Sequence, residues 1–287
     1  MTHKSDKRVS TSKQVIVLVV FLAIGTLIIL VFSPWQPVLV SRYDYIGRMA
    51  LIVVLFLISQ AARINPKLQD YWLVLFGLFI LITAISFDYI SGIFLIKQIG
   101  ITDATPLGWA IQKFNEFVVV VGTVLIVNKL GGQDLKSLYI QRGKLRLGLI
   151  IGMSTFLLAA AGSIPMSSLF NAQNLSVSQI LPWVPWIIIF VLANAAMEEV
   201  LFRGLFLKKL APFVGKFPAN LLIATVFTLI HGFTSYSTDN LIFVAILFPL
   251  ALAWGWVMQK TEGVWGSILF HAGMDIPIML GIFSNLS

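Results

Sequence analysis

The sequence contains no cysteine, and only 11% of its 287 residues are charged. The absence of cysteine excludes disulfides and thiolate sites. Soluble domains usually carry about 25% charged residues, so this chain has too few polar side chains to cover a water-facing surface. Hydrophobic residues make up 58% of the sequence, and the mean hydropathy is +0.93. The chain is therefore predicted to lie mostly in lipid.

The apolar residues come in long unbroken runs, such as residues 15–32. A backbone in lipid must form its own hydrogen bonds, as a helix or a closed barrel. Barrel strands alternate apolar and polar residues, so the runs predict helices. Nine apolar segments are expected to be helical: 15–32, 45–62, 71–96, 107–127, 147–163, 184–207, 220–232, 241–258 and 264–283. Segment 220–232 is short for a span of about 20 residues. We therefore predict an all-α, polytopic transmembrane bundle with eight or nine spans.

Lysine and arginine residues are distributed unevenly between the connecting segments. With the N-terminus placed in the cytoplasm, 16 of the 20 Lys and Arg residues fall in inner segments. The four in outer segments or at helix ends are Arg42, Arg48, Lys97 and Lys113. Cytoplasmic loops of membrane proteins are enriched in these residues. The distribution predicts a multi-pass cell-membrane protein with a cytoplasmic N-terminus, and it explains the net charge of +8 without a nucleic-acid partner.

Three further segments can be interpreted from their charge and length. The first apolar run is too long for a signal peptide and lacks a small-residue cleavage site, so it is expected to be a retained helix. Residues 128–146 form a basic stretch suited to the inner anionic leaflet. Residues 164–183 carry no charge and are expected to form an outer, partly membrane-lying segment.

Ionisable residues inside the predicted spans are the functional candidates, because a charge in hydrocarbon is costly unless it is paired or wetted. Glu198, His231, His271 and Asp275 fall in three spans that are far apart in the sequence. At about 1.5 Å of rise per helical residue, all four lie about 10 to 16 Å from the inner border. A shared depth predicts one polar layer, in the cytoplasmic half of the bilayer.

Local spacing adds detail to this layer. Glu199 and Arg203 stand four residues apart, which suits an ion pair on one helix and leaves Glu198 to face another way. His271 and Asp275 have the same spacing and are expected to point at one spot. Taken singly, each of these pairs is also a common structural feature, so the prediction depends on their shared depth.

Apart from Phe227, the other notable residues in or near the spans are expected to be mainly structural. Phe227 stands four residues before His231 and is expected to wall the site. Asp88 is expected at the outer interface, and Lys113 is expected to pair with Glu116. Three tryptophans flank the inner ends of the last two spans and are typical of interfacial anchors: Trp254, Trp256 and Trp265.

The polar residues also form three ordered motifs. These are Glu198-Glu199-Val200-Leu201-Phe202-Arg203-Gly204 (EExxxR), Phe227-Thr228-Leu229-Ile230-His231 (FxxxH) and His271-Ala272-Gly273-Met274-Asp275 (HxxxN/D). In these motifs the sequence resembles the CPBP intramembrane endopeptidases, which include the type II CAAX prenyl endopeptidase, the Abi proteins and bacteriocin self-immunity proteins. The resemblance covers about residues 145–283. We expect residues 1–144 to form the first four spans with a basic cytoplasmic stretch, and 145–287 to form the catalytic helical core.

The resemblance implies a membrane endopeptidase that opens toward the cytosol and cleaves a membrane-associated peptide or protein. It implies that Glu198 and His231 activate a water, that His271 and residue 275 hold the oxyanion, and that Glu199 and Arg203 support them. Characterised prenyl endopeptidases have Asn where this chain has Asp275. An ionised Asp cannot donate a hydrogen bond, so Asp275 is left three alternatives: to be protonated, to orient His271, or to bind a metal.

Two questions stay open at the level of sequence. No cofactor is expected, and the alternative is Zn²⁺ bound by His231, His271 and Asp275 with Glu198 as the base. The same polar layer also suits two other kinds of protein, an ion or metal transporter and a non-proteolytic immunity or peptide-binding membrane protein. In all three cases the lipid bilayer is a partner and nucleic acid is not.

Overall fold

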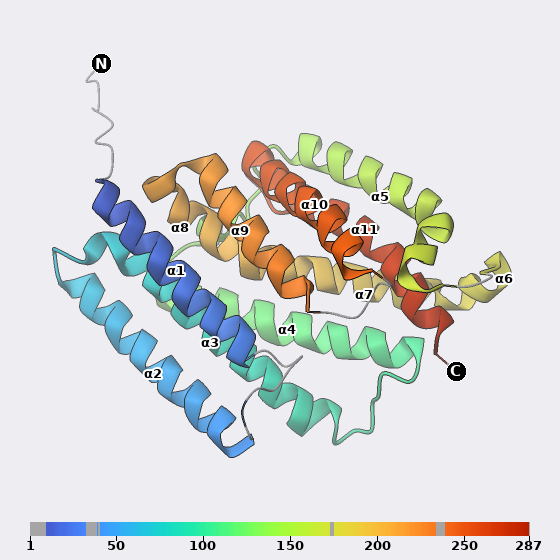
Figure 1. The fold of residues 1–287 in the computed structure, drawn as a ribbon, viewed down its shortest axis with the longest axis horizontal. Coiled ribbons are helices and arrows are strands. Elements are labelled where there is room, and N and C mark those ends of the chain that lie inside the picture. Colours follow the sequence, from blue (N-terminus) through green and yellow to red (C-terminus); the bar gives the residue numbers. More distant parts are fainter. Residues whose placement is uncertain (1–9, 33–38, 40, 173–174, 234–238, 287) are drawn as a thin grey trace.

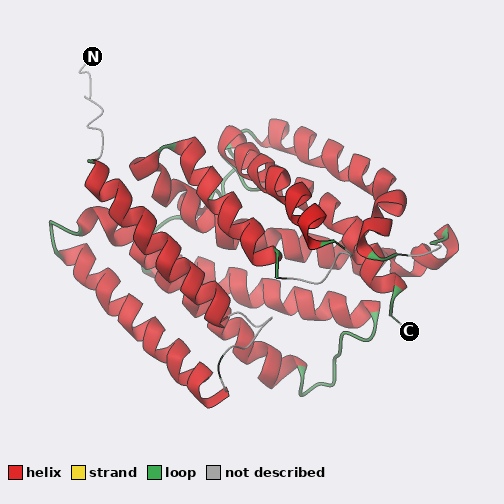
Figure 2. Ribbon diagram, viewed as in Figure 1, coloured by secondary structure: helices red, strands yellow, loops and turns green. Residues whose placement is uncertain are grey.

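A computed structural model of the chain describes residues 10–32, 39, 41–172, 175–233 and 239–286. These residues form helices and connecting loops, with no β-strand among them (Figure 2). The predicted all-α membrane architecture is confirmed, because eight helical runs in the described residues are long and apolar enough to cross a membrane. His3 and the basic residues Lys4, Lys7 and Arg8, which were counted toward the inner segments, lie outside the described residues.

The main helices follow the predicted segments in order (Figure 1). They are α1 (Thr11–Phe32), α2 (Ser41–Ile64), α3 (Trp72–Ser91), α4 (Pro106–Leu130), α5 (Leu145–Ser167), α6 (Val177–Ile180), α7 (Val184–Glu198), α8 (Leu205–Val214), α9 (Lys216–His231), α10 (Asn240–Thr261) and α11 (Trp265–Ser284). Local sequence sets several of the helix starts. Before α4, Thr105 accepts a hydrogen bond from the Gly108 backbone, and Pro106 occupies the first turn, where its missing N–H costs nothing.

Helices α7 and α8 belong to one continuous run, from Val177 to Val214. They are joined by η6 (Glu199–Gly204), one turn of π-helix that holds most of the EExxxR motif. Gly215, with a φ of 91°, then turns the chain into α9. Helix α9 has 16 residues, or about 24 Å at 1.5 Å per residue. The weakest predicted span, 220–232, is thus a helix, but a short one. Its length explains why the sequence predicts either eight or nine spans.

The helices share a hydrophobic core that runs from α1 to the start of α11. Fully buried side chains from distant parts of the chain meet there, such as Ile28, Leu78 and Leu205. At one edge of the bundle, α5 lies beside α11 (Figure 1). A Cβ placed on Gly266 of α11 would lie only 2.6 Å from the Gly148 carbonyl oxygen of α5. The backbones of these two helices therefore touch, which fixes the position of α11.

The segments predicted to be inner lie together at one end of the molecule. Lys13, at the start of α1, forms an ion pair with Asp70 in the link between α2 and α3. The Lys208 ammonium donates to the Lys136 carbonyl, which joins α8 to the 131–144 segment. Such contacts agree with the alternation of spans deduced from charge. Which end faces the cytoplasm stays a prediction.

Candidate active site

Four polar side chains from three helices lie at the floor of one cavity. Glu198 ends α7, His231 ends α9, and His271 and Asp275 lie one turn apart in α11. All four are buried. The Glu198 carboxylate lies 3.7 Å from His231 Nε2 and 3.5 Å from His271 Nε2, and His271 Nε2 lies 3.6 Å from Asp275 Oδ1. The fold thus brings together the four residues of the predicted polar layer, while their catalytic roles remain predictions.

The neighbouring carboxylate, Glu199, points away from the cavity and is fully paired. Its Oε1 accepts a hydrogen bond of 2.7 Å from Arg203, and both side chains are completely buried. The Arg203 guanidinium also donates to the Ala251 carbonyl at 3.1 Å and lies 4.8 Å from the centre of the Phe227 ring. A buried charge needs such compensation to be tolerated. Arg203 therefore neutralises Glu199 and leaves Glu198 to face the cavity.

Hydrogen bonds at the rear of both histidines set which ring nitrogen carries a proton. His231 Nδ1 lies 2.8 Å from the Phe227 carbonyl oxygen, which can only accept. His271 Nδ1 lies 2.9 Å from Glu199 Oε1, which also accepts because Arg203 keeps it charged. Each Nδ1 must therefore donate, and in the neutral imidazole the Nε2 is then free of a proton. Both Nε2 atoms face Glu198.

The cavity above this floor has a volume of about 200 Å³. Much of its lining consists of apolar side chains from α4, α7, α10 and α11, among them Trp109, Phe190, Phe243, Leu247, Ile278 and Met279. Phe227 also lines it, and its ring centre lies 4.3 Å from that of His231. A small set of polar groups at the base of an apolar pocket is typical of a binding site.

The structure adds two residues that the sequence reasoning missed. Asn194, one turn before Glu198 on α7, donates a hydrogen bond of 3.0 Å from its amide to Asp275 Oδ2. Ser267, one turn before His271, donates to Glu199 Oε2 at 2.5 Å. Each stands four residues from a motif residue, and that spacing was the signal that could have found them.

Three expectations about nearby residues need comment. Trp254 is not an interfacial anchor: it is 1% exposed, and its ring stacks on His271 at 3.8 Å with an angle of 10°. Asp88 was expected at the outer membrane interface, but its side chain is buried inside the bundle. Lys113 pairs with Glu116 as predicted, and both residues also line the cavity. A hydropathy pattern cannot show that Trp254 faces the interior of the bundle, because a tryptophan adds the same hydropathy whether it is buried or lies at the membrane interface.

The lining of the cavity lies toward one end of the bundle. It includes Asp103, which is exposed just before α4, and the early residues of α4 and α10. The charge distribution predicts that this end is outer, whereas the family resemblance implies an opening toward the cytosol. For this chain the two expectations place the opening on opposite sides of the membrane.

The described residues contain no group of three His, Asp or Glu side chains placed as metal ligands. We therefore derive no step through a metal, and the alternative with Zn²⁺ on His231, His271 and Asp275 stays a question for chemical analysis.

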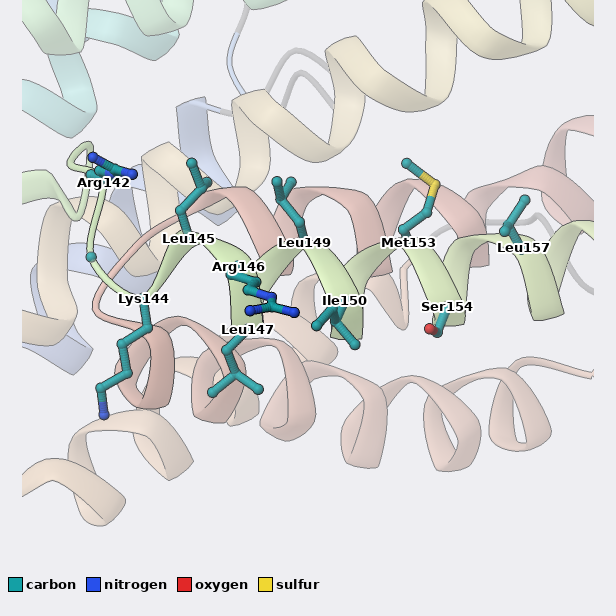
Figure 3. Close-up of a pocket in the computed structure, with 11 residues that line it drawn as sticks. Arg142, Lys144, Leu145, Arg146, Leu147, Leu149, Ile150, Met153, Ser154 and Leu157 are labelled. Atoms are coloured by element: carbon teal, nitrogen blue, oxygen red, sulfur yellow. The ribbon is translucent and has the colours of Figure 1, made fainter.

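A larger surface hollow lies elsewhere. It has a volume of about 1160 Å³ and follows α5, with Arg142, Lys144 and Arg146 at one end and Leu147, Ile150, Met153 and Leu157 along the helix (Figure 3). Basic residues at a helix end beside exposed aliphatic side chains are typical of a helix that meets lipid near the headgroups. This surface contains none of the motif residues, so we do not assign it to the site.

Comparison with known proteins agrees with the motifs. Residues 180–277 match the family described as type II CAAX prenyl endopeptidase Rce1-like. No curated protein and no solved structure matches the chain. The matched segment extends from the end of α6 to the middle of α11 and so includes Glu198, His231, His271 and Asp275. Residues 180–277 of this multi-pass membrane protein are thus similar to the Rce1-like type II CAAX prenyl endopeptidases.

Proposed function

We propose that the chain is an intramembrane endopeptidase that hydrolyses a peptide bond of a membrane-associated peptide or protein, using a water activated by Glu198 and His231. The observation that carries the proposal is the pairing of a buried carboxylate with an imidazole Nε2, 3.7 Å apart, at the floor of an apolar cavity. Both groups are proton acceptors in the tautomer that the Phe227 carbonyl selects.

The separation of Glu198 and His231 suits a bridging water. A direct hydrogen bond between nitrogen and oxygen is usually about 2.7 to 3.2 Å long, so 3.7 Å is too long for a strong one. One water can bond to both groups across such a gap. In addition, Glu198 Oε2 is buried and makes no hydrogen bond to the described residues. A carboxylate held in this way is ready to accept a proton from water.

The proposed reaction follows from these positions. As the water oxygen bonds to the carbonyl carbon of the substrate, Glu198 or His231 accepts one water proton. The carbonyl becomes a tetrahedral oxyanion. The accepted proton then passes to the amide nitrogen, the carbon–nitrogen bond breaks, and a carboxylic acid and an amine leave. Glu199 and Arg203 take no part in the proton transfers, because they are occupied in holding His271.

The lining of the cavity indicates the kind of substrate. Trp109, Phe190 and Phe243 surround the floor with aromatic surface, which favours apolar side chains beside the bond that is cut. A volume of about 200 Å³ leaves room for only a short stretch of peptide. We therefore propose an extended substrate segment rather than an intact helix.

The test is cleavage of candidate membrane-proximal peptides by purified protein in detergent, followed by mass spectrometry. Glu198→Gln keeps the size of the side chain but removes its ability to take a proton. We expect the cleavage rate to fall by about 100-fold to 10,000-fold, the usual contribution of a general base. Glu262→Gln, in the exposed turn before α11, is the matched control and should cleave normally.

Three outcomes would contradict this assignment. Near-normal cleavage by a folded Glu198→Gln protein would show that Glu198 is not the base. Tight binding of peptides without cleavage by the unaltered protein, unaffected by Glu198→Gln, would instead favour a peptide-binding or immunity protein. Ion uptake into vesicles containing the protein would favour a transporter.

A further inference from the structure

The pairing of Asn194 with Asp275 bears on a gap in the proposed reaction. A tetrahedral oxyanion needs hydrogen-bond donors held at the place where its charge develops. Residue 275 is expected to fill that role in the family pattern. Here it is Asp275, whose carboxylate oxygens only accept when ionised. The site therefore needs a donor from another position.

Asn194 brings an amide group to the same place. It lines the cavity from α7 and is half-buried, one turn before Glu198. Residues four apart on a helix have Cβ atoms about 5 to 6 Å apart, so the amide and the base lie side by side. The amide nitrogen is 3.0 Å from Asp275 Oδ2. Because a carboxylate can only accept, the nitrogen must face it.

This geometry leaves a second donor. An Asn side chain carries two amide hydrogens. Among the described residues, the Asn194 side chain makes one hydrogen bond to another side chain, the bond to Asp275, and this bond uses a single hydrogen. The second amide hydrogen points away from Asp275. Because Asn194 lines the cavity, this hydrogen is available to a bound substrate.

Other donors at the floor are less suited to the role. His271 donates from Nδ1 to Glu199, and its Nε2 faces two carboxylates, Glu198 and Asp275. The backbone N–H groups beside the motif residues lie inside helices, where they bond to helix carbonyls. Lys113 lines the cavity but forms an ion pair with Glu116.

We propose that Asn194 donates the hydrogen bond that stabilises the substrate oxyanion, and that Asp275 holds the Asn194 amide in place by accepting its other hydrogen. This inference rests on the proposed peptidase function. The role that the family pattern gives to one Asn is thus shared by two residues on facing helices, with the amide on α7 and the carboxylate on α11. Asn194 transfers no proton, so the reaction remains balanced as described.

The experiment compares Asn194→Ala with the double variant Asn194→Ala and Asp275→Asn. Losing one oxyanion donor typically lowers kcat by about 100-fold to 1,000-fold, and we expect that loss in N194A with little change in KM. The double variant places an amide in the polar layer again, at position 275. Its kcat should be at least about tenfold higher than that of N194A, which corresponds to 1.4 kcal/mol. Asn115→Ala is the matched control, because Asn115 bonds Ser91 inside the bundle and does not line the cavity.

Rescue by the second substitution separates an oxyanion donor from a structural residue. A folded N194A protein with near-normal kcat would overturn the proposal, and so would a double variant as slow as N194A. If N194A does not fold, the swapped pair N194D/D275N keeps one amide and one carboxylate in contact. Activity within about tenfold of normal would then support the proposal, and a folded but inactive pair would overturn it. The Glu198→Gln result is independent, so failure here leaves the peptidase assignment standing.

Discussion

The charged side chains behind the floor of the cavity form a fixed chain of ion pairs and hydrogen bonds. Arg203 compensates Glu199, and Glu199 in turn orients His271 from behind. Removing one member of a buried ion pair typically costs about 3 to 5 kcal/mol, because the other charge is left unpaired. The Trp254 ring stacks on one face of the same imidazole. The imidazole is therefore held by its neighbours before any substrate binds.

Metal dependence is a question about His231, His271 and Asp275. We expect thoroughly dialysed protein to hold no stoichiometric zinc and to keep its cleavage rate in a strong chelator. We also expect Asp275→Asn to be tolerated near neutral pH, because an amide at that position can donate. Elemental analysis and cleavage assays measure both. Zinc that is bound one per chain, and lost together with activity, would contradict the metal-free scheme.

Part of the site could be predicted from single residues and part could not. Glu198, His231, His271 and Asp275 stand out because ionisable groups are rare in apolar runs, and their depth follows from helical rise. Asn194 carries no charge, so only its four-residue spacing from Glu198 distinguished it from a packing residue. Its importance depends on which face of α11 opposes α7, and that is set by tertiary contacts which no local pattern encodes.

Two features of the helices position this layer. The π-helical turn η6 widens the helix where Glu198 gives way to Glu199, and such turns are often found at functional sites. Helix α11, which carries His271 and Asp275, contacts α5 through glycine at Gly266. Small residues allow membrane helices to approach closely. The hydropathy of segment 264–283 predicted a span, but it gave no sign of this close contact.

A methyl group at the contact between α5 and α11 should disturb the site. In Gly266→Ala the new Cβ would lie 2.6 Å from the Gly148 carbonyl oxygen, so the helices must separate. Overpacking typically costs about 1 to 3 kcal/mol, and we expect a lower Tm in detergent and slower cleavage. Gly122→Ala on α4 is the matched control, because no atom beyond the adjacent backbone of its own helix lies within 4 Å of its Cβ position. Equal Tm values for the two variants would contradict this account of the packing.

The residues at which the helices begin and end were harder to predict from the sequence than the helices themselves. The segment 184–207 belongs to a helical run that extends from Val177 to Val214. Its last part, α8, holds Lys208 and Lys209, whose charges ended the apolar pattern without ending the helix. Helix α9 likewise begins at Lys216, four residues before the apolar segment. Hydropathy detects the part of a helix that lies in lipid, whereas backbone hydrogen bonds continue beyond it.

For the whole molecule, the orientation in the membrane can be tested with single cysteines, since the chain has none of its own. Lys136 and Lys97 are both exposed and lie in segments predicted to be on opposite sides. A membrane-impermeant maleimide added to intact cells should label Lys97→Cys, and should label Lys136→Cys only after the membrane is opened. The reverse pattern would invert the topology. Asp103→Cys, at the edge of the cavity, should label on the same side as Lys97→Cys.

The one-sided lining of the cavity has a pharmacological consequence. A polar inhibitor that cannot diffuse through a bilayer would be expected to reach Glu198 from the side on which Asp103 is exposed. With the topology predicted from charge, such a compound would act from outside the cell without having to enter it, and export pumps would offer no resistance. With the opposite topology, the same compound would need an uptake route. The side labelled at position 103 therefore decides which chemical libraries are worth screening against living cells.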